Sequence, residues 1–378
     1  MEVPFLDLKI QYKSIKSEID SAIQKVLDNT AFILGPSVAD FEKEFAKAHN
    51  VTHCIGTSSG TDGNHLALWS LDIGPGDEVI IPANTFIATA WGATLCGANI
   101  KLVDCHKESY NIDPEKVKNA ITKKTKAIVA VHLYGQPADM DLLKKIADEF
   151  KIHLVEDAAQ AHLAEYKGKK IGGLSEVCSF SFYPGKNLGA YGEAGAVSTN
   201  NDVLAEKIKK LREHGQSKKY HHETYGHNYR MEGIQGAVLG VKLKHLDKWT
   251  TGRRNVAEKY RKLLGNLEQI KLPKEMPEHK HVYHLYVIKV NTGNQKKNQE
   301  VRDKLQAHLQ ENNISTGLHY PIPLHLQNCF KHLEYKYGDF PETEMLAESG
   351  LSLPMYPELT DEQIEYVADN IKNFFKKN

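Results

Sequence analysis

The chain has 378 residues, of which 41% are hydrophobic and 25% are charged, as in ordinary globular proteins. Its 48 basic and 48 acidic side chains cancel at pH 7, so there is no basic excess of the kind that binds nucleic acid. The length suffices for one large domain and a smaller one, and no apolar stretch reaches membrane-spanning length.

The N-terminal segment and the cysteines indicate the compartment. Residues 1–7 lack the basic and then apolar pattern of a secretory signal. The five cysteines lie in apolar surroundings without a CxxC pair, which favours buried thiols in a reducing compartment. We therefore expect a cytoplasmic protein.

The first chemical signal along the chain is the segment 56–63, Gly-Thr-Ser-Ser-Gly-Thr-Asp-Gly, between a short apolar run and a helical pattern. Glycines let the backbone approach a ligand closely, and free amides at a helix N-terminus suit a phosphate group. Taken alone, an ordinary N-cap by Ser59 or Thr61 explains this segment better.

Strand and helix patterns then alternate from about residue 50 to residue 245. The helical stretch 140–150 places Leu142, Leu143 and Ile146 on one side, with Asp139 as its cap. Apolar runs separated by such helices predict a mainly parallel sheet covered on both faces. The runs are residues 78–81, 100–103, 127–131, 153–155 and 177–182.

The last two runs lead into the most informative pair of segments. Asp157 stands in Leu-Val-Glu-Asp-Ala-Ala-Gln-Ala-His (154–162), and Lys186 follows in Tyr-Pro-Gly-Lys-Asn-Leu-Gly (183–189). Open α/β sheets bind ligands at the carboxyl ends of their strands. An acid and an amine at one edge suit pyridoxal phosphate, because the lysine forms a Schiff base and the carboxylate keeps the ring nitrogen protonated. Each segment alone also fits a surface lysine or a helix-capping aspartate; together with the phosphate seat they favour the cofactor site.

The pattern changes after Trp249, which places a domain boundary near residue 246. We expect a large cofactor-binding domain over 1–245 and a small C-terminal domain over 246–378. Thr360-Asp-Glu-Gln363 forms a capping-box pattern before the last helix. The other elements expected in the small domain are helices over 256–264 and 298–312, a strand over 282–288 and a strand near Ile314.

Three motifs give the chain a family resemblance: residues 155–162, 181–189 and 319–325 (His-Tyr-Pro-Ile-Pro-Leu-His). With them the chain resembles, nearly end to end, the sugar-nucleotide aminotransferases of the DegT/DnrJ/EryC1/StrS group of fold-type-I pyridoxal phosphate enzymes. The resemblance implies an α/β fold: a large domain whose mainly parallel, seven-stranded-type sheet is flanked by helices, plus a smaller C-terminal α/β domain.

The resemblance also assigns the cofactor contacts. Lys186 resembles the Schiff-base lysine, Asp157 the partner of the ring nitrogen and Gln160 a contact to the ring hydroxyl, and Phe86 would stack on the ring. The phosphate would be held by Ser181 and by the amides of Gly60 and Thr61. Asn228 would reach the phosphate of the other subunit, so the resemblance implies a homodimer with shared active sites.

For the reaction, the resemblance implies L-glutamate as amino donor and a nucleotide-linked keto sugar as acceptor. Lys186, once freed, is the natural general base because it stays tethered beside the substrate carbon. A solvated loop explains the basic segment 218–222 as well as a diphosphate contact does, and the two histidines of 319–325 suggest no metal, since a third ligand is lacking. Candidate substrate contacts are Tyr183, Lys219, Tyr220, Tyr225, His319, Tyr320 and His325.

Segments 183–189 and 222–228 are most similar to enzymes that aminate C3 of dTDP-3-keto-6-deoxyhexoses, and less so to the C4-aminating branch. A related sugar dehydratase would carry histidine in place of Lys186. A non-catalytic binding or regulatory protein of the same fold is the third alternative, which the intact set Asp157, Gln160, Ser181 and Lys186 disfavours.

Overall fold

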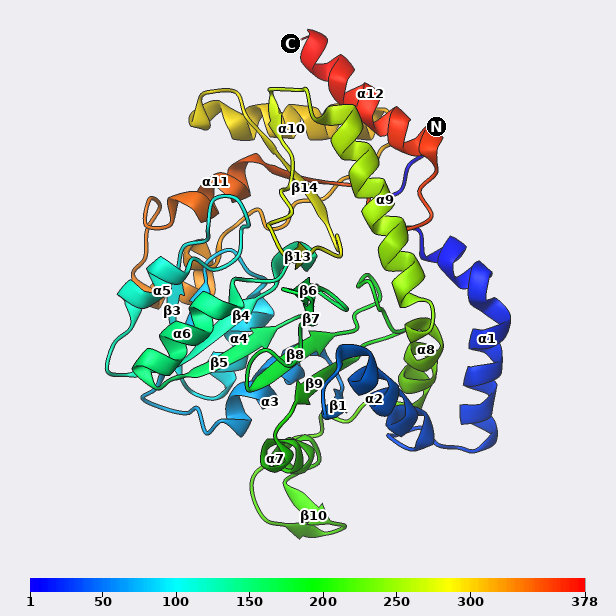
Figure 1. Ribbon diagram of the computed structural model, residues 1–378, viewed down its shortest axis with the longest axis vertical. Helices are drawn as coiled ribbons and strands as arrows, with labels where there is room; N and C mark the ends of the chain where they lie inside the picture. Colours follow the sequence, from blue (N-terminus) through cyan, green and yellow to red (C-terminus); the bar gives the residue numbers. More distant parts are fainter. Residues whose placement is uncertain (378) are drawn as a thin grey trace.

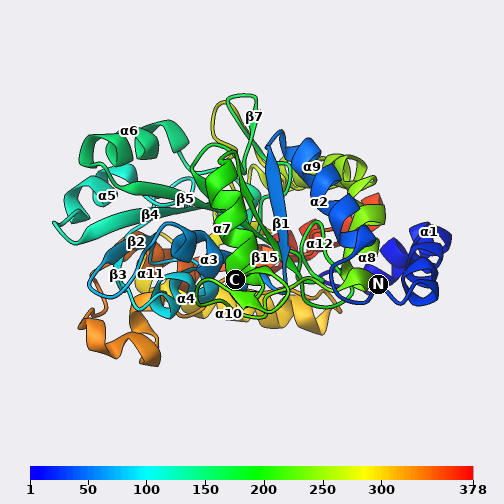
Figure 2. The same ribbon diagram turned by 90° about the horizontal axis from the view of Figure 1, so that it is seen from below.

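The computed structural model describes residues 1–377 and is built on a seven-stranded sheet covered by helices on both faces (Figures 1 and 2). The strand order is β1-β9-β8-β5-β4-β2-β3; β9 runs antiparallel to its two neighbours and the other pairs are parallel. The mainly parallel sheet expected from the sequence is confirmed. Its strands are β1 (His53–Thr57), β2 (Glu78–Pro82), β3 (Asn99–Val103), β4 (Thr125–Val131), β5 (His153–Asp157), β8 (Val177–Ser181) and β9 (Gly195–Thr199).

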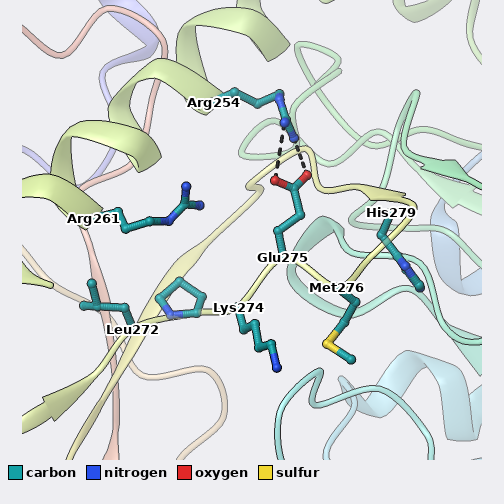
Figure 3. Close-up of a pocket in the computed structure, with 8 residues that line it drawn as sticks. Arg254, Arg261, Leu272, Lys274, Glu275, Met276 and His279 are labelled. Atoms are coloured by element: carbon teal, nitrogen blue, oxygen red, sulfur yellow. Dashed lines mark hydrogen bonds and ion pairs between the residues drawn. The ribbon is translucent and has the colours of Figure 1, made fainter.

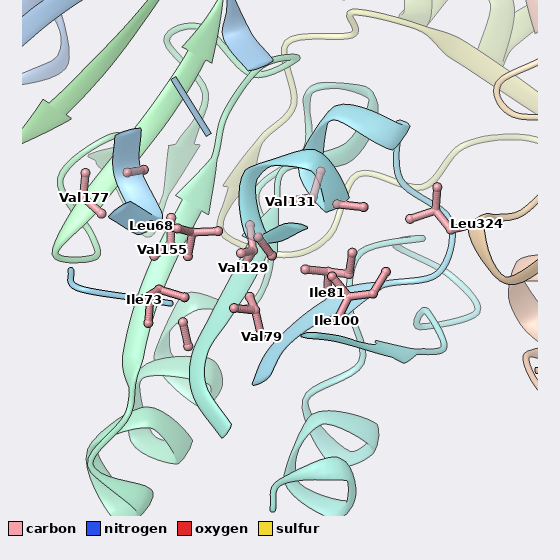
Figure 4. Close-up of a cluster of buried hydrophobic side chains, with 14 of the residues drawn as sticks. Leu68, Ile73, Val79, Ile81, Ile100, Val129, Val131, Val155, Val177 and Leu324 are labelled. Carbon is pink, nitrogen blue, oxygen red and sulfur yellow. The ribbon is translucent and has the colours of Figure 1, made fainter. Parts of the chain in front are cut away.

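Alternation along the strands explains why both faces of the sheet are buried, because successive side chains point to opposite faces. Val79 and Ile81 of β2 join one apolar cluster with Val129 of β4 (Figure 4). Ile80 and Ile128, on the other face, join a second cluster. Figure 2 shows α5 and α6 on one face of the sheet and α3, α4 and α7 on the other. These helices are α3 (Gly60–Ser70), α4 (Ile87–Leu95), α5 (Pro114–Ala120), α6 (Met140–Phe150) and α7 (Asp202–Arg212).

The remaining elements surround this sheet. The other helices are α1 (Leu8–Asp28), α2 (Pro36–His49), α8 (Gly233–Leu243), α9 (Leu246–Leu264), α10 (Gln295–Glu311), α11 (Pro341–Ser349) and α12 (Asp361–Lys377), with 3₁₀ turns at Leu133–Gly135, Leu324–Leu326 and Asn328–Leu333. A three-stranded sheet joins β12 (Ile270–Lys271), β14 (Tyr286–Val290) and β15 (Gly350–Leu353). The short strands are β6 (Glu165–Tyr166), β7 (Lys169–Lys170), β10 (Gln216–Lys218), β11 (His221–His222) and β13 (His279–Lys280).

The C-terminal part has its own apolar core, which also takes in the N-terminus. Val3 packs in the cluster that contains Tyr260, Ile288 and Phe374, and it forms a parallel bridge with Ile314. The division of the chain at residue 246 stays a prediction. Val3, although near the N-terminus, is part of the C-terminal core.

Several sequence expectations need correction. The strand expected over 282–288 begins only at Tyr286, because Gly135, Asn187 and Arg253 take the backbone groups of residues 282–284. Near Ile314 there is an isolated bridge instead of a strand. Cys329 is exposed, since the 3₁₀ turn that carries it turns Phe330 inward instead. None of the helices in residues 1–377 is long and apolar enough to cross a bilayer.

Candidate active site

Asp157, the last residue of β5, is fixed at the carboxyl edge of the sheet. Its side chain is buried, and its Oδ2 accepts hydrogen bonds from Asn64 Nδ2 (3.0 Å) and Thr89 Oγ1 (2.8 Å). The amide of Ala159 donates to Oδ1 (3.1 Å). A buried carboxylate needs such donors to remain in place. The structure therefore holds a negative group rigidly at the edge where ligands of open α/β sheets bind.

Lys186 faces this carboxylate from the turn that follows β8. Its amide donates to the Tyr183 carbonyl oxygen (2.8 Å), and the next residue, Asn187, is tied to the Val282 carbonyl oxygen (3.0 Å). Burial lowers the pKa of Lys186 to about 8, and the nearby charge of Asp157 opposes that shift. A larger fraction of neutral amine is thus present near neutral pH than for an exposed lysine, as a nucleophile or base requires.

A seat for a phosphate group lies at the N-terminus of α3. Ser59 caps this helix by accepting the Asp62 amide on its hydroxyl (3.1 Å), which leaves the amides of Gly60 and Thr61 without a partner among residues 1–377. Ser181, the last residue of β8, lies against them, since a methyl group added to Gly60 would lie 3.0 Å from the Ser181 hydroxyl oxygen. Two free amides, a hydroxyl and the positive end of a helix suit a phosphate.

Gln160 and two aromatic rings form the side of the site nearest the C-terminal part. Gln160 accepts the Tyr134 amide on Oε1 (2.6 Å) and donates from Nε2 to the Tyr320 hydroxyl (3.0 Å). The rings of Tyr320 and Phe86 lie 5.5 Å apart, and the Phe86 side chain is about half exposed. The Tyr134 hydroxyl donates to the carbonyl oxygen of His319.

Three histidines lie close enough to Lys186 for its charge to act on them. Burial, with a smaller effect of Lys186, lowers the pKa of His319 to about 4. Burial also lowers the pKa of His284 well below its usual value, again with Lys186 contributing, and the same holds for His162, where His49 acts as well. These three rings are therefore neutral near pH 7 and add no positive charge next to Lys186.

The residues assigned by motif thus fall into two groups. Lys186, Asp157, Gln160, Ser181, Gly60, Thr61, Phe86, His319 and Tyr320 gather around the ends of β5 and β8, with Tyr183 exposed at the rim. The structure does not bring the others to this place. His325 is buried, and its Nε2 pairs with Glu344 (2.9 Å), so no substrate reaches it here and we leave it out of the proposed site.

The remaining candidates lie on an arm formed by residues 216–228, with Asn228 at its base, where it forms a bridge with Glu213. Its hairpin, β10 and β11, extends beyond α7 away from the body of the molecule (Figure 1). Tyr220 and Tyr225 are 80% and 89% exposed, and Lys219 and Asn228 are exposed too. Within the described residues no hydrogen bond or ring contact links Lys219, Tyr220 or Tyr225 to Lys186. The residue after Asn228, Tyr229, accepts the amide of Ser58 on its carbonyl oxygen (2.9 Å), close to the phosphate seat.

Sequence reasoning missed Asn64 and Thr89, which hold Asp157. Both stand inside helices, where a polar residue normally indicates a solvated face, and each becomes buried only because α3 and α4 pack side by side against the sheet. Tyr134, which orients Gln160 and the segment at His319, was missed for a similar reason. It lies in a 3₁₀ turn without a helical or strand pattern.

A separate cavity of about 560 Å³ lies between α9 and residues 272–279 (Figure 3). Glu275 already neutralises Arg254 through two hydrogen bonds, and Lys274 pairs with Glu108. None of the residues around Lys186 lines it, so this cavity is not the candidate active site.

The residues at the strand ends fit pyridoxal phosphate by the chemistry of their side chains. The cofactor needs an amine of lowered pKa, a fixed carboxylate for the ring nitrogen and donors for the phosphate. Lys186, Asp157 and the two partnerless amides at Gly60 and Thr61 supply these in one place.

Comparison with known proteins gives the following matches. Residues 13–372 match the DegT/DnrJ/EryC1/StrS aminotransferase family. The chain is 45% identical to the "Pleiotropic regulatory protein" of Geobacillus stearothermophilus, covering 100% of this chain and 99% of that protein. It is 43% identical to the dTDP-3-amino-3,4,6-trideoxy-alpha-D-glucose transaminase of Streptomyces venezuelae, with 99% and 97% covered. A UDP-N-acetyl-3-dehydro-alpha-D-glucosamine 3-aminotransferase of Acidithiobacillus ferrooxidans is 39% identical, with 98% and 97% covered.

Two solved structures resemble the chain over nearly its whole length. The S. venezuelae protein DesV superposes with a TM-score of 0.95 at 43% identity, with 99% of this chain and 98% of that chain covered. A Bacillus subtilis protein with bound cofactor PMP superposes with a TM-score of 0.90 at 32% identity, with 99% and 85% covered. The second structure shows this cofactor type on the same fold.

Proposed function

The chain belongs to the DegT/DnrJ/EryC1/StrS aminotransferase family, and we propose that it transfers the amino group of L-glutamate to C3 of a dTDP-linked 3-keto-6-deoxyhexose. It is a sugar aminotransferase that depends on pyridoxal phosphate. The observation that carries the proposal is Lys186, with its pKa lowered to about 8, facing Asp157 beside the free amides of α3.

The roles of the residues follow from their chemistry. When bound, pyridoxal phosphate withdraws electrons from the substrate carbon that carries the nitrogen. Asp157, held by Asn64 and Thr89, would keep a proton on the ring nitrogen. Lys186 is the general base that takes the proton from the substrate carbon and returns one. Gly60, Thr61 and Ser181 would hold the phosphate, Gln160 would contact the ring hydroxyl and Phe86 would lie against the ring. His319, Tyr320 and Tyr183 lie where the sugar would enter.

The nucleotide and the carbon position are the finer parts of this proposal. The dTDP-linked 3-keto sugar is supported by the name of the S. venezuelae relative and by segments 183–189 and 222–228. A UDP-linked sugar, as named for the A. ferrooxidans relative, is the alternative acceptor. C4 of the sugar is the alternative position for the amino group.

We also propose a homodimer with shared sites. The arm over 216–228 leaves Tyr220, Tyr225 and Asn228 exposed to solvent. Long ordered loops usually have a function, and across a two-fold axis this arm would contribute twice, once to each site. In the dimer, Asn228 would reach the partner's phosphate and Lys219, Tyr220 and Tyr225 the partner's substrate.

The test is to incubate the protein with pyridoxal phosphate, L-glutamate and a panel of dTDP- and UDP-linked 3-keto and 4-keto sugars. The amino sugar is identified by mass and NMR, with Lys186→Met as the inactive control. Amination of a dTDP-linked sugar at C3 is the expected result. Turnover of UDP-linked or 4-keto sugars alone would instead select one of those alternatives.

A regulatory protein is the second candidate, because the G. stearothermophilus relative carries a regulatory name. That candidate predicts cofactor binding without conversion of glutamate to 2-oxoglutarate. The half-reaction with glutamate needs no sugar, so it separates the two functions even when the right acceptor is missing from the panel.

A further inference from the structure

Lys242, near the C-terminal end of α8, is a buried lysine beneath the loop that carries Lys186. Its side chain is 1% exposed, and its Nζ donates to the carbonyl oxygen of Gly189 (2.5 Å). The ring of Tyr191 lies 5.0 Å from the same nitrogen. Both contacts are made to residues of one short segment, which begins three residues after Lys186.

This segment is tightly folded and tied to its surroundings at several points. The Ala190 amide donates to the Phe182 carbonyl oxygen (2.8 Å), and a methyl group added to Gly189 would lie 2.3 Å from the carbonyl oxygen of Pro184. Gln235, also on α8, accepts the Tyr191 amide (3.0 Å). Residues 182–191 therefore form a closed turn around Lys186, and α8 holds its far end.

The burial of Lys242 is costly, which indicates a specific use for its amine. Burial lowers the pKa of Lys242 to about 7, and the charge of Glu358 opposes this. Among the described residues no carboxylate forms an ion pair with Lys242. Burial raises the pKa of the Glu358 carboxyl, which also lies near Arg253. An apolar side chain of similar length would pack at such a position without this cost.

The amine gives something that an apolar side chain lacks, a donor for the Gly189 carbonyl. Among the described residues no other donor bonds to this oxygen, and Gly189 is itself buried. A buried carbonyl without a donor is unfavourable, so the segment would move to find one. The same segment carries Lys186, and a reaction slows steeply when a reacting group is displaced by about 1 Å.

We propose that Lys242 is a positioning residue for Lys186: by holding the Gly189 carbonyl it fixes the turn 182–191 and thereby the direction of the reactive amine. The proposal rests on the role proposed above for Lys186. Lys242 does not contact the reacting atoms. Its charge is also not among the influences on the pKa of Lys186, which burial lowers and Asp157 raises.

The experiment compares Lys242→Met and Lys242→Gln with the matched control Lys244→Met. Lys244 is exposed and directly follows α8. Apo-protein is mixed with pyridoxal phosphate, and the growth of the visible absorption band is followed at several pH values. Borohydride reduction and peptide mapping then measure how much of the cofactor is attached to Lys186. The melting temperature of each variant is recorded alongside.

We expect Lys242→Met to lower the plateau rate of cofactor attachment about tenfold or more, because the amine of Lys186 would be misplaced. The pH midpoint should stay near 8, and the melting temperature should change little, because a buried charge and a hydrogen bond are lost together. Lys242→Gln, which keeps an N–H donor, should recover part of the rate, and it serves as the test if the methionine variant does not fold.

A plateau rate equal to that of Lys244→Met would overturn the proposal, and so would a shifted pH midpoint at an unchanged plateau, since that result would assign Lys242 an electrostatic effect. Failure of the proposed function would look different. In that case the wild-type protein itself would show the cofactor attached to a lysine other than Lys186, whatever the Lys242 variants do.

Discussion

Gly60 and Ser181 touch so closely that a methyl group added to Gly60 would lie 2.5 Å from the Cβ of Ser181. Gly60 begins α3 and Ser181 ends β8, so this contact joins the helix N-terminus to the strand that leads to Lys186. Any side chain at position 60 must push the two apart. The proposed phosphate seat therefore depends on a glycine for reasons of space.

The first prediction concerns this contact. Gly60→Ala should weaken the binding of pyridoxal phosphate about tenfold or more, because overpacking costs about 1–3 kcal/mol and displaces the free amides. Titration of the apo-protein, followed by absorbance, measures the effect. Binding of pyridoxal without phosphate should change less. Gly240→Ala, in a helix with nothing within 4 Å, is the control and should bind normally.

Asp157→Asn should keep the cofactor bound but slow the half-reaction with glutamate by about 100-fold or more, as removal of a fixed charge partner does in other enzymes. An amide cannot hold a proton on the ring nitrogen by charge, and its NH₂ would meet the Asn64 and Thr89 donors. Single-turnover absorbance with glutamate checks this. A rate close to wild type would remove Asp157 from its proposed role. Asp139→Asn, at the cap of α6, is the matched control.

Lys186→Ala should lose turnover by at least about 100-fold while the protein stays folded, because the side chain is only half-buried and lies in the site beside Asp157. The measurements are turnover, the visible band of the bound cofactor and the melting temperature. If both turnover and the band survive, another residue holds the cofactor.

The pH dependence of cofactor attachment should report the lowered pKa of Lys186. Only the neutral amine reacts, so below a pH of about 8 the rate should fall about tenfold per pH unit, and above it the rate should level off. An exposed lysine, with a pKa of about 10.4, would still be gaining rate at pH 9. A midpoint above 9.5 would contradict the burial and geometry described here.

Shared sites can be tested by mixing subunits. A Lys186→Ala chain and an Asn228→Ala chain, each weakly active alone, would form mixed dimers in which one site carries both changes and the other carries neither. Part of the activity should then return. If subunits demonstrably exchange and both parents are folded, yet no activity returns, Asn228 acts within its own subunit or not at all.

The sequence predicted those elements whose signals are local. The helix over 140–150 and its Asp139 cap are confirmed, although Leu142, expected on the apolar side, is exposed. The capping box is confirmed too: Thr360 and Gln363 exchange hydrogen bonds. The strands at 78–81, 100–103 and 127–131 lie within one or two residues of the observed bounds. Periodicity and capping are properties of neighbouring residues, so one chain suffices to find them.

The features that were missed depend on contacts between distant residues. The helix expected from 256 begins at Leu246, and its Gly252, which weakens the pattern, is where the chain passes so close to Pro357 that a Cβ would lie 2.7 Å away. The supports of Asp157 come from α3 and α4, and no local pattern distinguishes them from solvated polar residues. His325 looked like a ligand contact because its buried partner, Glu344, is 19 residues away.

The bridge between Val3 and Ile314 sets a limit on how early the chain can finish folding on the ribosome. The amide of Val3 donates to the Asn313 carbonyl oxygen, and its own carbonyl accepts from Ser315, both at 2.9 Å. The two partners emerge more than 300 residues apart, which at ~5–20 residues per second is about 15–60 s. The central sheet has all its strands by residue 199 and can form during that time. Val3 is therefore synthesised before every strand of the central sheet, yet it reaches its place after them.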